Sequence, residues 1–256
     1  MAPLAVAIAW YGNWPFALFW GVISLGVWWE WSGLVAPDER RALIGAGGLA
    51  LVLSAVFAII ELYDRAALLI AMGAFAAAAF APRNRRDWAA GGVIYAGIIG
   101  LAPVLLRAEA GLGLVAILLV FAVVWSTDVV AYFVGRAVGG PKLWPRVSPK
   151  KTWSGALGGI AGAIAAALSV AHLAGLANWR WIATVALILS VVSQLGDLFE
   201  SAMKRRFDAK DSGALIPGHG GLMDRLDGFV VAVLLATVIG LVRGGGDRIA
   251  SGLLVW

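Results

Sequence analysis

Six of the chain's 15 acidic residues lie in one segment of the sequence, between positions 197 and 227. They are Asp197, Glu200, Asp208, Asp211, Asp224 and Asp227. The segment contains one His and no Cys, and oxygen ligands of this kind favour a hard cation such as Mg²⁺ over Zn²⁺. The basic residues among the acids are Lys204, Arg205, Arg206, Lys210 and Arg225. Together these residue types predict phosphoryl or nucleotidyl transfer, in which a protein mainly positions phosphates and stabilises their charge.

The position of Asp197 argues against a solvated loop, which is the alternative interpretation of this charge cluster. A largely apolar run over residues 182–195 precedes Asp197, so its carboxylate is expected at or just inside the membrane interface. On a helix leaving the membrane, Asp197, Ser201 and Lys204 are spaced i, i+4 and i+7. We therefore expect one helix face to present a carboxylate, a hydroxyl and an ammonium group together.

An acidic pair and a glycine-rich turn lie further along the same segment. Asp224 and Asp227 are spaced i, i+3 at the start of the last apolar run, which predicts that both lie on one helix face. A helix N-cap, the structural alternative, needs only one Asp. Residues 217–221 read Pro-Gly-His-Gly-Gly, and three glycines allow backbone N–H groups to come close to a ligand. The turn is not a Walker loop, because the GK[ST] ending is missing.

A second basic segment, residues 135–153, contains five Lys and Arg residues and no acid. It ends in Ser148-Pro149-Lys150-Lys151-Thr152, just before an apolar run that begins at Gly155. Thr152 or Ser154 is expected to cap that helix, and a helix N-terminus beside ammonium groups binds anions. Retention of positive charge on the cytoplasmic side is the alternative explanation. Asp128, near the end of the preceding apolar run, is a further site candidate because intramembrane carboxylates are costly.

The elements that must position these residues are membrane helices. The 256-residue chain is 61% hydrophobic and 14% charged, whereas soluble domains are about a quarter charged. The absence of Cys excludes a disulfide scaffold, and the long apolar runs exclude a β-barrel. A net charge of +5 is what loops facing anionic lipid would give, so we expect a lipid bilayer as partner and no nucleic acid.

The apolar runs predict an all-α, polytopic integral membrane protein with about eight transmembrane helices. The expected spans are residues 15–36, 42–60, 66–81, 89–106, 112–134, 155–176, 181–198 and 228–242. The apolar stretch 4–10 is too short to cross, and it would make nine helices if it is the remnant of a longer one. We expect one continuous membrane domain, with N-terminal helices in residues 1–120 and C-terminal helices carrying a cytoplasmic-face site in residues 121–256.

The distribution of Lys and Arg predicts the orientation of these spans. With eight alternating spans, 15 of the 20 basic residues fall on one side of the membrane. Positive residues are retained on the cytoplasmic side, so the two charged segments should both face the cytoplasm. We therefore expect a multi-pass protein of the cell inner membrane with its active site facing the cytoplasm.

The residues between positions 201 and 227 resemble the signature of the phosphatidate cytidylyltransferase (CDP-diacylglycerol synthase) family. The matching stretches are Ser201-Ala-Met203-Lys204-Arg205, Lys210-Asp211-Ser-Gly213 and Ile216-Pro217-Gly-His219-Gly220-Gly221-Leu222-Met-Asp224-Arg225-Leu226-Asp227. The segments 148–152 and 194–197 are also similar to family features. The resemblance implies transfer of CMP from CTP to phosphatidic acid, giving CDP-diacylglycerol and pyrophosphate. It also implies a Mg²⁺ requirement, with room for a second cation, and a homodimer.

The resemblance suggests roles for individual residues. Asp197 and Asp224 are expected to be the first metal ligands, with Asp227 as a ligand or a neighbour of the ligands. The other expected catalytic residues are Lys204, Arg205, Lys210, Asp211, His219 and Arg225. The expected substrate-binding residues are Asp128, Ser148, Lys150, Lys151, Thr152, Ser201, Gly220 and Gly221.

Two other functions were weighed against this one. A CDP-alcohol phosphotransferase also uses metal-bound carboxylates, but the motif of that family is absent, and residues 224–228 resemble it only superficially. A transporter or flippase would carry its charges near the middle of the membrane, in broken helices. In this chain the acids gather toward one face instead.

Overall fold

A computed structural model of the protein describes residues 2–209, 211–213, 215 and 220–255. The chain forms two compact units. The first unit contains residues 1–108 and 206–226, and the second contains residues 109–205 and 227–256. The segment 206–226 thus packs with the N-terminal helices, although it is far from them in the sequence.

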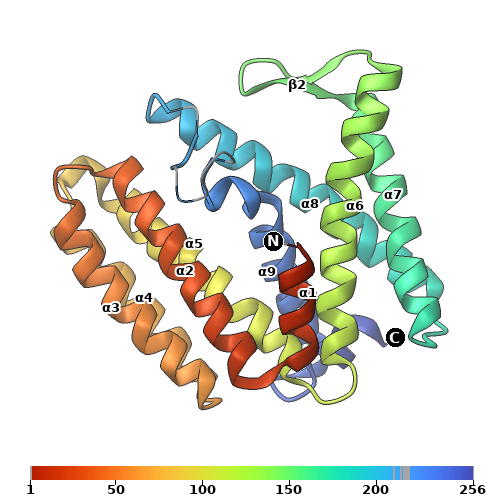
Figure 1. The fold of residues 1–256 in the computed structure, drawn as a ribbon, viewed down its shortest axis with the longest axis horizontal. Helices are drawn as coiled ribbons and strands as arrows, with labels where there is room; N and C mark the ends of the chain where they lie inside the picture. Colours follow the sequence, from red (N-terminus) through yellow and green to blue (C-terminus); the bar gives the residue numbers. More distant parts are fainter. Residues whose placement is uncertain (1, 210, 214, 216–219, 256) are drawn as a thin grey trace. The chain divides into compact units, whose positions relative to one another are not determined.

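In the described residues, the first unit contains five α-helices and two 3-10 helices (Figure 1). Its elements are α1 (Ala2–Tyr11), α2 (Asn13–Val35), α3 (Arg40–Ile59), α4 (Tyr63–Phe80), the 3-10 helix η1 (Arg83–Arg85), α5 (Arg86–Ala108) and the 3-10 helix η2 (Met223–Arg225). Short turns join α2 to α5 in sequence, so neighbouring helices run antiparallel. α2 packs on α3 and α5, α4 packs on α3 and α5, and η2 packs on α2.

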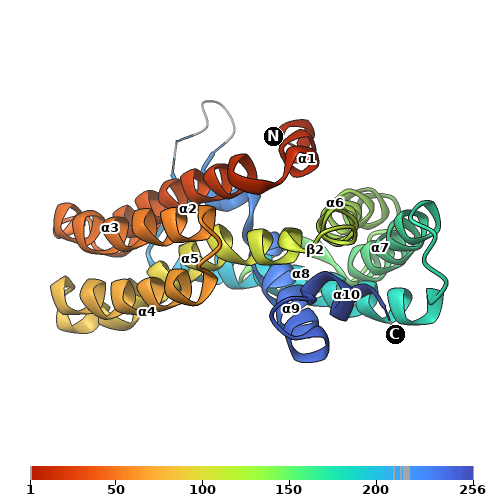
Figure 2. The same ribbon diagram turned by 90° about the horizontal axis from the view of Figure 1, so that it is seen from below.

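The second unit contains five helices and a β-hairpin. Its elements are α6 (Gly113–Val138), β1 (Lys142–Trp144), β2 (Ser148–Thr152), α7 (Trp153–Leu173), α8 (Trp179–Arg206), α9 (Asp227–Gly244) and α10 (Ile249–Leu254). Figure 2 shows α6 and α7 side by side. Their close approach depends on Gly155 and Gly159, where an added Cβ would lie 2.7 Å from the Ala131 oxygen and 2.9 Å from the Thr127 oxygen. Small residues bring membrane helices together in this way.

The second basic segment, residues 135–153, contains a β-hairpin that the sequence did not predict. β1 and β2 pair antiparallel, with Lys142 opposite Thr152 and Trp144 opposite Ser148. Trp153 N donates to the Pro141 oxygen at 3.0 Å, so the ladder leads directly into α7. The hairpin holds the basic segment in a defined position at the start of that helix.

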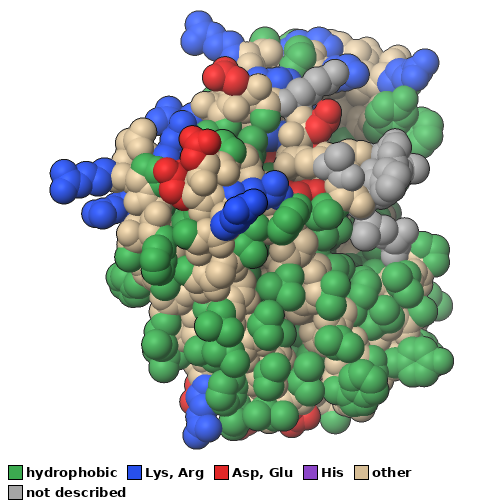
Figure 3. Space-filling model, turned by 60° about the vertical axis from the view of Figure 1, so that its left-hand side comes forward, with side chains coloured by type: hydrophobic (Ala, Val, Ile, Leu, Met, Phe, Trp, Pro, Cys, Tyr) green, Lys and Arg blue, Asp and Glu red, His purple; other side chains and the backbone are tan. Residues whose placement is uncertain are grey.

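The prediction of an all-α, polytopic membrane protein is confirmed. In the described part of the chain, seven helices, α3 to α9, are long and apolar enough to cross a membrane. α2 has 23 residues, but five Trp residues and Glu30 lower its mean hydropathy. Exposed apolar side chains such as Leu49, Val56 and Phe75 lie along α3 and α4. Hydrophobic side chains cover much of the face drawn in Figure 3, as expected of a surface that contacts lipid.

Candidate functional site

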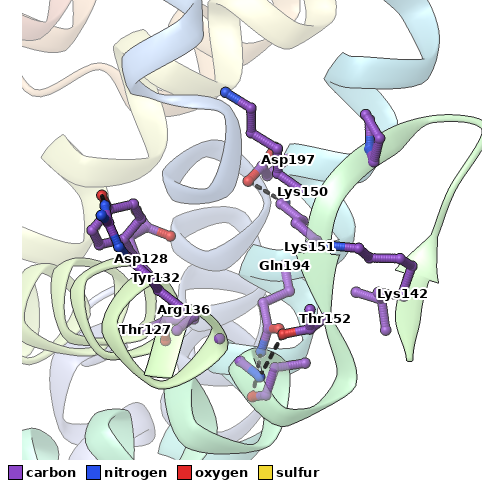
Figure 4. Close-up of a pocket in the computed structure, with 16 residues that line it drawn as sticks. Thr127, Asp128, Tyr132, Arg136, Lys142, Lys150, Lys151, Thr152, Gln194 and Asp197 are labelled. Atoms are coloured by element: carbon purple, nitrogen blue, oxygen red, sulfur yellow. Dashed lines mark hydrogen bonds and ion pairs between the residues drawn. The ribbon is translucent and has the colours of Figure 1, made fainter. Parts of the chain in front are cut away.

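The second unit contains a pocket of about 600 Å³ between α6, the hairpin, the start of α7 and α8 (Figure 4). A volume of this size is within the range of small-molecule sites, which is about 300–1,000 Å³. Its polar lining residues are Thr127, Asp128, Tyr132, Arg136, Lys142, Lys150, Lys151, Thr152, Gln194 and Asp197. Four of them are basic and two are acidic, so the lining carries a surplus of positive charge that suits a polyanion such as a triphosphate.

An ion pair between Lys151 and Asp197 joins two walls of this pocket. Lys151 Nζ donates to Asp197 Oδ2, and both side chains are about 30% exposed. The two residues are 46 positions apart in the sequence, one on β2 and one on α8. The pair therefore neutralises a half-buried carboxylate while both groups remain accessible from the pocket.

The start of α7 fixes the position of Lys151. Thr152 is the N-cap of α7, and its Oγ1 accepts a hydrogen bond from Gly155 N at 3.1 Å. Of the two residues expected to cap this helix, Thr152 and Ser154, Thr152 is the N-cap. Ser154 Oγ lies 3.0 Å from Thr152 Oγ1 and donates to the Gly139 oxygen. The capped turn places a lysine, a hydroxyl and a helix N-terminus at one wall of the pocket, an arrangement that favours anions.

Two more carboxylates lie within electrostatic range of Asp197. Asp128 on α6 and Asp227 at the start of α9 each interact with Asp197 and with Lys151. Glycines permit α8 and α9 to approach each other closely. A Cβ on Gly196 would lie 2.6 Å from the backbone carbonyl oxygen of Asp227. On the facing helix, a Cβ on Gly228 would lie 2.6 Å from Ser193 Oγ. The sequence therefore brings three Asp residues from three helices toward one region.

The expectation that Asp224 and Asp227 share one helix face is wrong. Asp224 lies in η2, whereas α9 begins at Asp227. Leu226, with φ −123° and ψ 0°, ends the 3-10 turn and separates the two elements. Local spacing suggested a continuous helix, but the helical backbone is interrupted at Leu226, between the two carboxylates.

The end of α8 arranges its side chains partly as expected. Ser201 Oγ donates to Asp197 Oδ1 at 3.5 Å, so hydroxyl and carboxylate do lie together. Lys204 Nζ instead forms an ion pair with Glu200 Oε1 at 3.3 Å. Glu200 is buried, with 1% of its surface exposed, and was not among the predicted site residues. The i, i+4 spacing of Glu200 and Lys204 is the signal that could have found this pair.

The loop that carries much of the signature lies in the first unit and is held by two carboxylates. Asp224 Oδ2 accepts hydrogen bonds from Ser212 N at 3.1 Å, Ser212 Oγ at 2.8 Å and Gly221 N at 2.9 Å. Glu30 on α2 accepts from Leu222 N and Met223 N, both at 2.8 Å. The sequence analysis assigns Glu30 no role. Its position, a carboxylate within an apolar and Trp-rich run, is the sequence feature that could have marked Glu30 as a functional residue.

The predicted site residues therefore fall into four groups. Ser201, Lys204 and Arg205 near the end of α8 and Asp227 at the start of α9 belong to the second unit but are outside the pocket lining. The pocket of the second unit is lined by Asp128, Lys150, Lys151, Thr152 and Asp197, whereas Ser148 is on β2 outside the lining. Asp211, Gly220, Gly221, Asp224 and Arg225 belong to the first unit. Lys210 and His219 lie outside the described residues, as do Pro217 and Gly218 of the glycine-rich turn. Sequence reasoning missed five polar lining residues, namely Thr127, Tyr132, Arg136, Lys142 and Gln194.

The donor set of the pocket fits Mg²⁺ better than a transition metal. Within the described residues, no group of three His, Cys, Asp or Glu side chains is arranged to hold a metal ion. Mg²⁺ does not need such a cage, since it commonly takes one or two carboxylates and completes its shell with water and substrate phosphate. Asp197, with Asp128 and Asp227 in electrostatic range, offers that kind of oxygen set.

Comparison with known proteins decides the family. The model of the "Cytidylyltransferase family" matches residues 1–242. The chain belongs to the cytidylyltransferase family. It is 43% identical over 255 residues to a phosphatidate cytidylyltransferase of Brucella abortus biovar 1 (strain 9-941), covering 98% of this chain and 93% of the relative.

Further relatives carry the same name. A phosphatidate cytidylyltransferase of Brucella suis biovar 1 (strain 1330) is 43% identical over 251 residues, covering 96% of this chain and 92% of that protein. One from Bacillus subtilis (strain 168) is 48% identical over 119 residues, covering 46% of this chain and 44% of its own length. The resemblance inferred from the signature is therefore confirmed. In a cytidylyltransferase, the basic pocket beside Asp197 is the natural candidate for the nucleotide phosphates.

Proposed function

We propose that the protein transfers CMP from CTP to phosphatidic acid, giving CDP-diacylglycerol and pyrophosphate for phospholipid biosynthesis. In this reaction an oxygen of the phosphatidate phosphate bonds to the α-phosphorus of CTP. The bond from that phosphorus to the oxygen bridging the β-phosphate breaks, and pyrophosphate leaves with that oxygen. The observation that carries the proposal is the pocket that sets Asp197 among four basic side chains, in a membrane chain of the cytidylyltransferase family.

The pocket residues supply binding and orientation. Three basic side chains of the lining are exposed, namely Arg136, Lys142 and Lys150. They can therefore bind phosphate oxygens without breaking an ion pair or hydrogen bond to a buried group. Lys151 is held by Asp197, and Thr152 fixes the first turn of α7. Fixed donors aimed at developing phosphate charge are the main means by which proteins accelerate such transfers.

We propose Mg²⁺ as the cofactor, with Asp197 as a ligand and Asp227 as a ligand or neighbour. When bound, Mg²⁺ would neutralise phosphate charge and favour departure of pyrophosphate. The carboxylates of Asp128 and Asp227, which lie in electrostatic range of Asp197, support this proposal. Asp224 stays a predicted ligand, and a second cation stays an expectation from the family resemblance.

We also propose a homodimer in the cell inner membrane, with the site facing the cytoplasm. The family resemblance supports the dimer. The distribution of charge supports the orientation, because Arg40, Arg41, Arg83, Arg85 and Arg86 all lie at one end of the antiparallel bundle α2–α5. The opposite end of the bundle carries Arg65 and Arg107. Positive residues gather on the cytoplasmic side of membrane proteins.

The proposal is tested with purified protein in detergent, given phosphatidate, Mg²⁺ and CTP labelled at the α-phosphate. We expect label to enter the lipid phase. Asp197→Asn should lower the rate by about 10²-fold or more, the scale of a lost charge-stabilising group. The matched control is Asp38→Asn, an exposed Asp in the turn between α2 and α3, and it should retain the parent rate. Label that stays in water with folded parent protein would contradict the proposed function.

A further inference from the structure

We propose that Glu30 is a positioning residue for two described stretches, residues 211–213 and 220–226, and that it holds Asp224 in place for the transfer reaction. This inference rests on the proposed function. Glu30 lies on α2 with only 3% of its surface exposed, and all of its contacts described below lie within the first unit. A carboxylate in such surroundings is costly unless its oxygens receive hydrogen bonds.

The two Glu30 oxygens receive donors from both ends of the loop. Oε1 accepts from Leu222 N at 2.8 Å, and Oε2 accepts from Met223 N at 2.8 Å. Ser212 Oγ lies 3.4 Å from Oε2. Leu222 and Met223 immediately precede Asp224, so Glu30 fixes the backbone from which the Asp224 side chain extends.

Asp224 binds the same loop from its other side. Its Oδ2 accepts from Ser212 N, Ser212 Oγ and Gly221 N. Ser212 therefore lies between the two carboxylates, 2.8 Å from Asp224 and 3.4 Å from Glu30 through its Oγ. Backbone N–H groups of residues 212, 221, 222 and 223 all point at carboxylate oxygens. Such charge-assisted bonds are stronger than neutral ones, so they fix the backbone at Ser212 and over residues 221–223.

Two glycines of the signature make this arrangement possible. A Cβ on Gly213 would lie 2.7 Å from Glu30 Oε1, and a Cβ on Gly221 would lie 2.8 Å from Glu30 Oε2 and 2.9 Å from Asp224 Oδ2. Real Cβ atoms essentially never approach other heavy atoms so closely. The backbone can therefore reach the two carboxylates only if these positions have no side chain.

Glu30→Gln tests the inference, because the amide keeps the size of the side chain but turns an NH₂ group toward an N–H donor. In hydrogen exchange of the full protein in detergent, we expect amides 220–226 to exchange about tenfold faster, the effect of losing one charge-assisted bond. Amides of α3 and α4 should keep their exchange rates. Turnover of CTP and phosphatidate should fall about tenfold at a temperature where the variant is still fully folded. The control, Glu61→Gln, changes an exposed Glu between α3 and α4 and should alter none of these readouts.

A double variant separates positioning from general stabilisation. Glu30→Gln and Ser212→Ala should have non-additive effects if both residues act through the same backbone conformation. The fold-loss of turnover in the double variant should then be smaller than the product of the two single fold-losses. Unchanged exchange of 220–226 in Glu30→Gln would overturn the inference, and so would an equal rise across α2–α5. A parent protein that transfers no CMP would refute the proposed function instead, while the exchange measurement would still decide whether Glu30 holds the loop.

Discussion

Replacing Gly196 with Ala should disturb the site without removing any of its functional groups. Gly196 precedes Asp197 on α8, where the helix touches the start of α9. The new methyl carbon would lie 2.6 Å from the backbone carbonyl oxygen of Asp227 and 2.9 Å from Val231 Cγ2. Because the first of these neighbours is backbone, it cannot move aside by rotating a side chain.

The size of the effect follows from this geometry. Restoring an ordinary contact of 3.4 Å requires α8 and α9 to separate by about 0.8 Å at this point. Overpacking of this kind costs about 1–3 kcal/mol of stability. A misplacement of about 1 Å at a reacting site costs about 10²-fold in rate. We therefore expect Gly196→Ala to lower CMP transfer by about 10-fold to 10²-fold and to lower the thermal midpoint.

The assay is transfer of labelled CMP to phosphatidate by purified protein, with thermal denaturation measured on the same samples. The matched control is Gly45→Ala on α3, where an added Cβ has nothing within 4 Å. That variant should retain both the rate and the midpoint, or gain slightly in stability from the better helix propensity of Ala. A Gly196→Ala protein with the parent rate would refute the argument that the close approach of α8 and α9 sets the geometry around Asp197.

Three other changes have defined outcomes. Lys151→Met should lower CMP transfer by about 10²-fold because Asp197 loses its ion-pair partner and the pocket loses a cation; a parent-like rate would remove Lys151 from the site. Thr152→Val should cost about 1 kcal/mol of stability through loss of the α7 cap, which thermal denaturation can measure, with Thr184→Val on the exposed side of α8 as control. Chelation of divalent ions should stop turnover and added Mg²⁺ should restore it, whereas turnover that persists in excess chelator would contradict the proposed cofactor.

Much of the helical fold could be predicted from the sequence because a bilayer demands long apolar runs. The expected spans 155–176 and 228–242 correspond closely to α7 and α9. The expected span 181–198 ends eight residues before α8 does, because backbone hydrogen bonding continues past the apolar run to Arg206. The Glu200–Lys204 pair stabilises that extension. Hydropathy marks the membrane boundary, not the end of the helix.

Some residues of the candidate site could be singled out from the sequence, but their contacts with one another could not. Asp197 and Lys151 were each recognised from local charge, yet their ion pair spans 46 residues. The hairpin that delivers Lys151 depends on backbone pairing between β1 and β2, which leaves no clear alternation in the sequence. Glu30 and the backbone it holds at Leu222 are 192 residues apart. Contacts of this range arise from tertiary packing, and no local pattern encodes them.

In the proposed reaction, the protein moves the nucleotidyl part of CTP, and not its terminal phosphate, onto phosphatidate. The most direct measurement uses CTP that carries tritium in the cytosine ring and ³²P in the γ-phosphate, with purified protein and phosphatidate. The proposed function predicts that tritium enters the lipid phase while ³²P stays in water as pyrophosphate. Transfer of ³²P to lipid, or retention of both labels in water by folded protein, would contradict it.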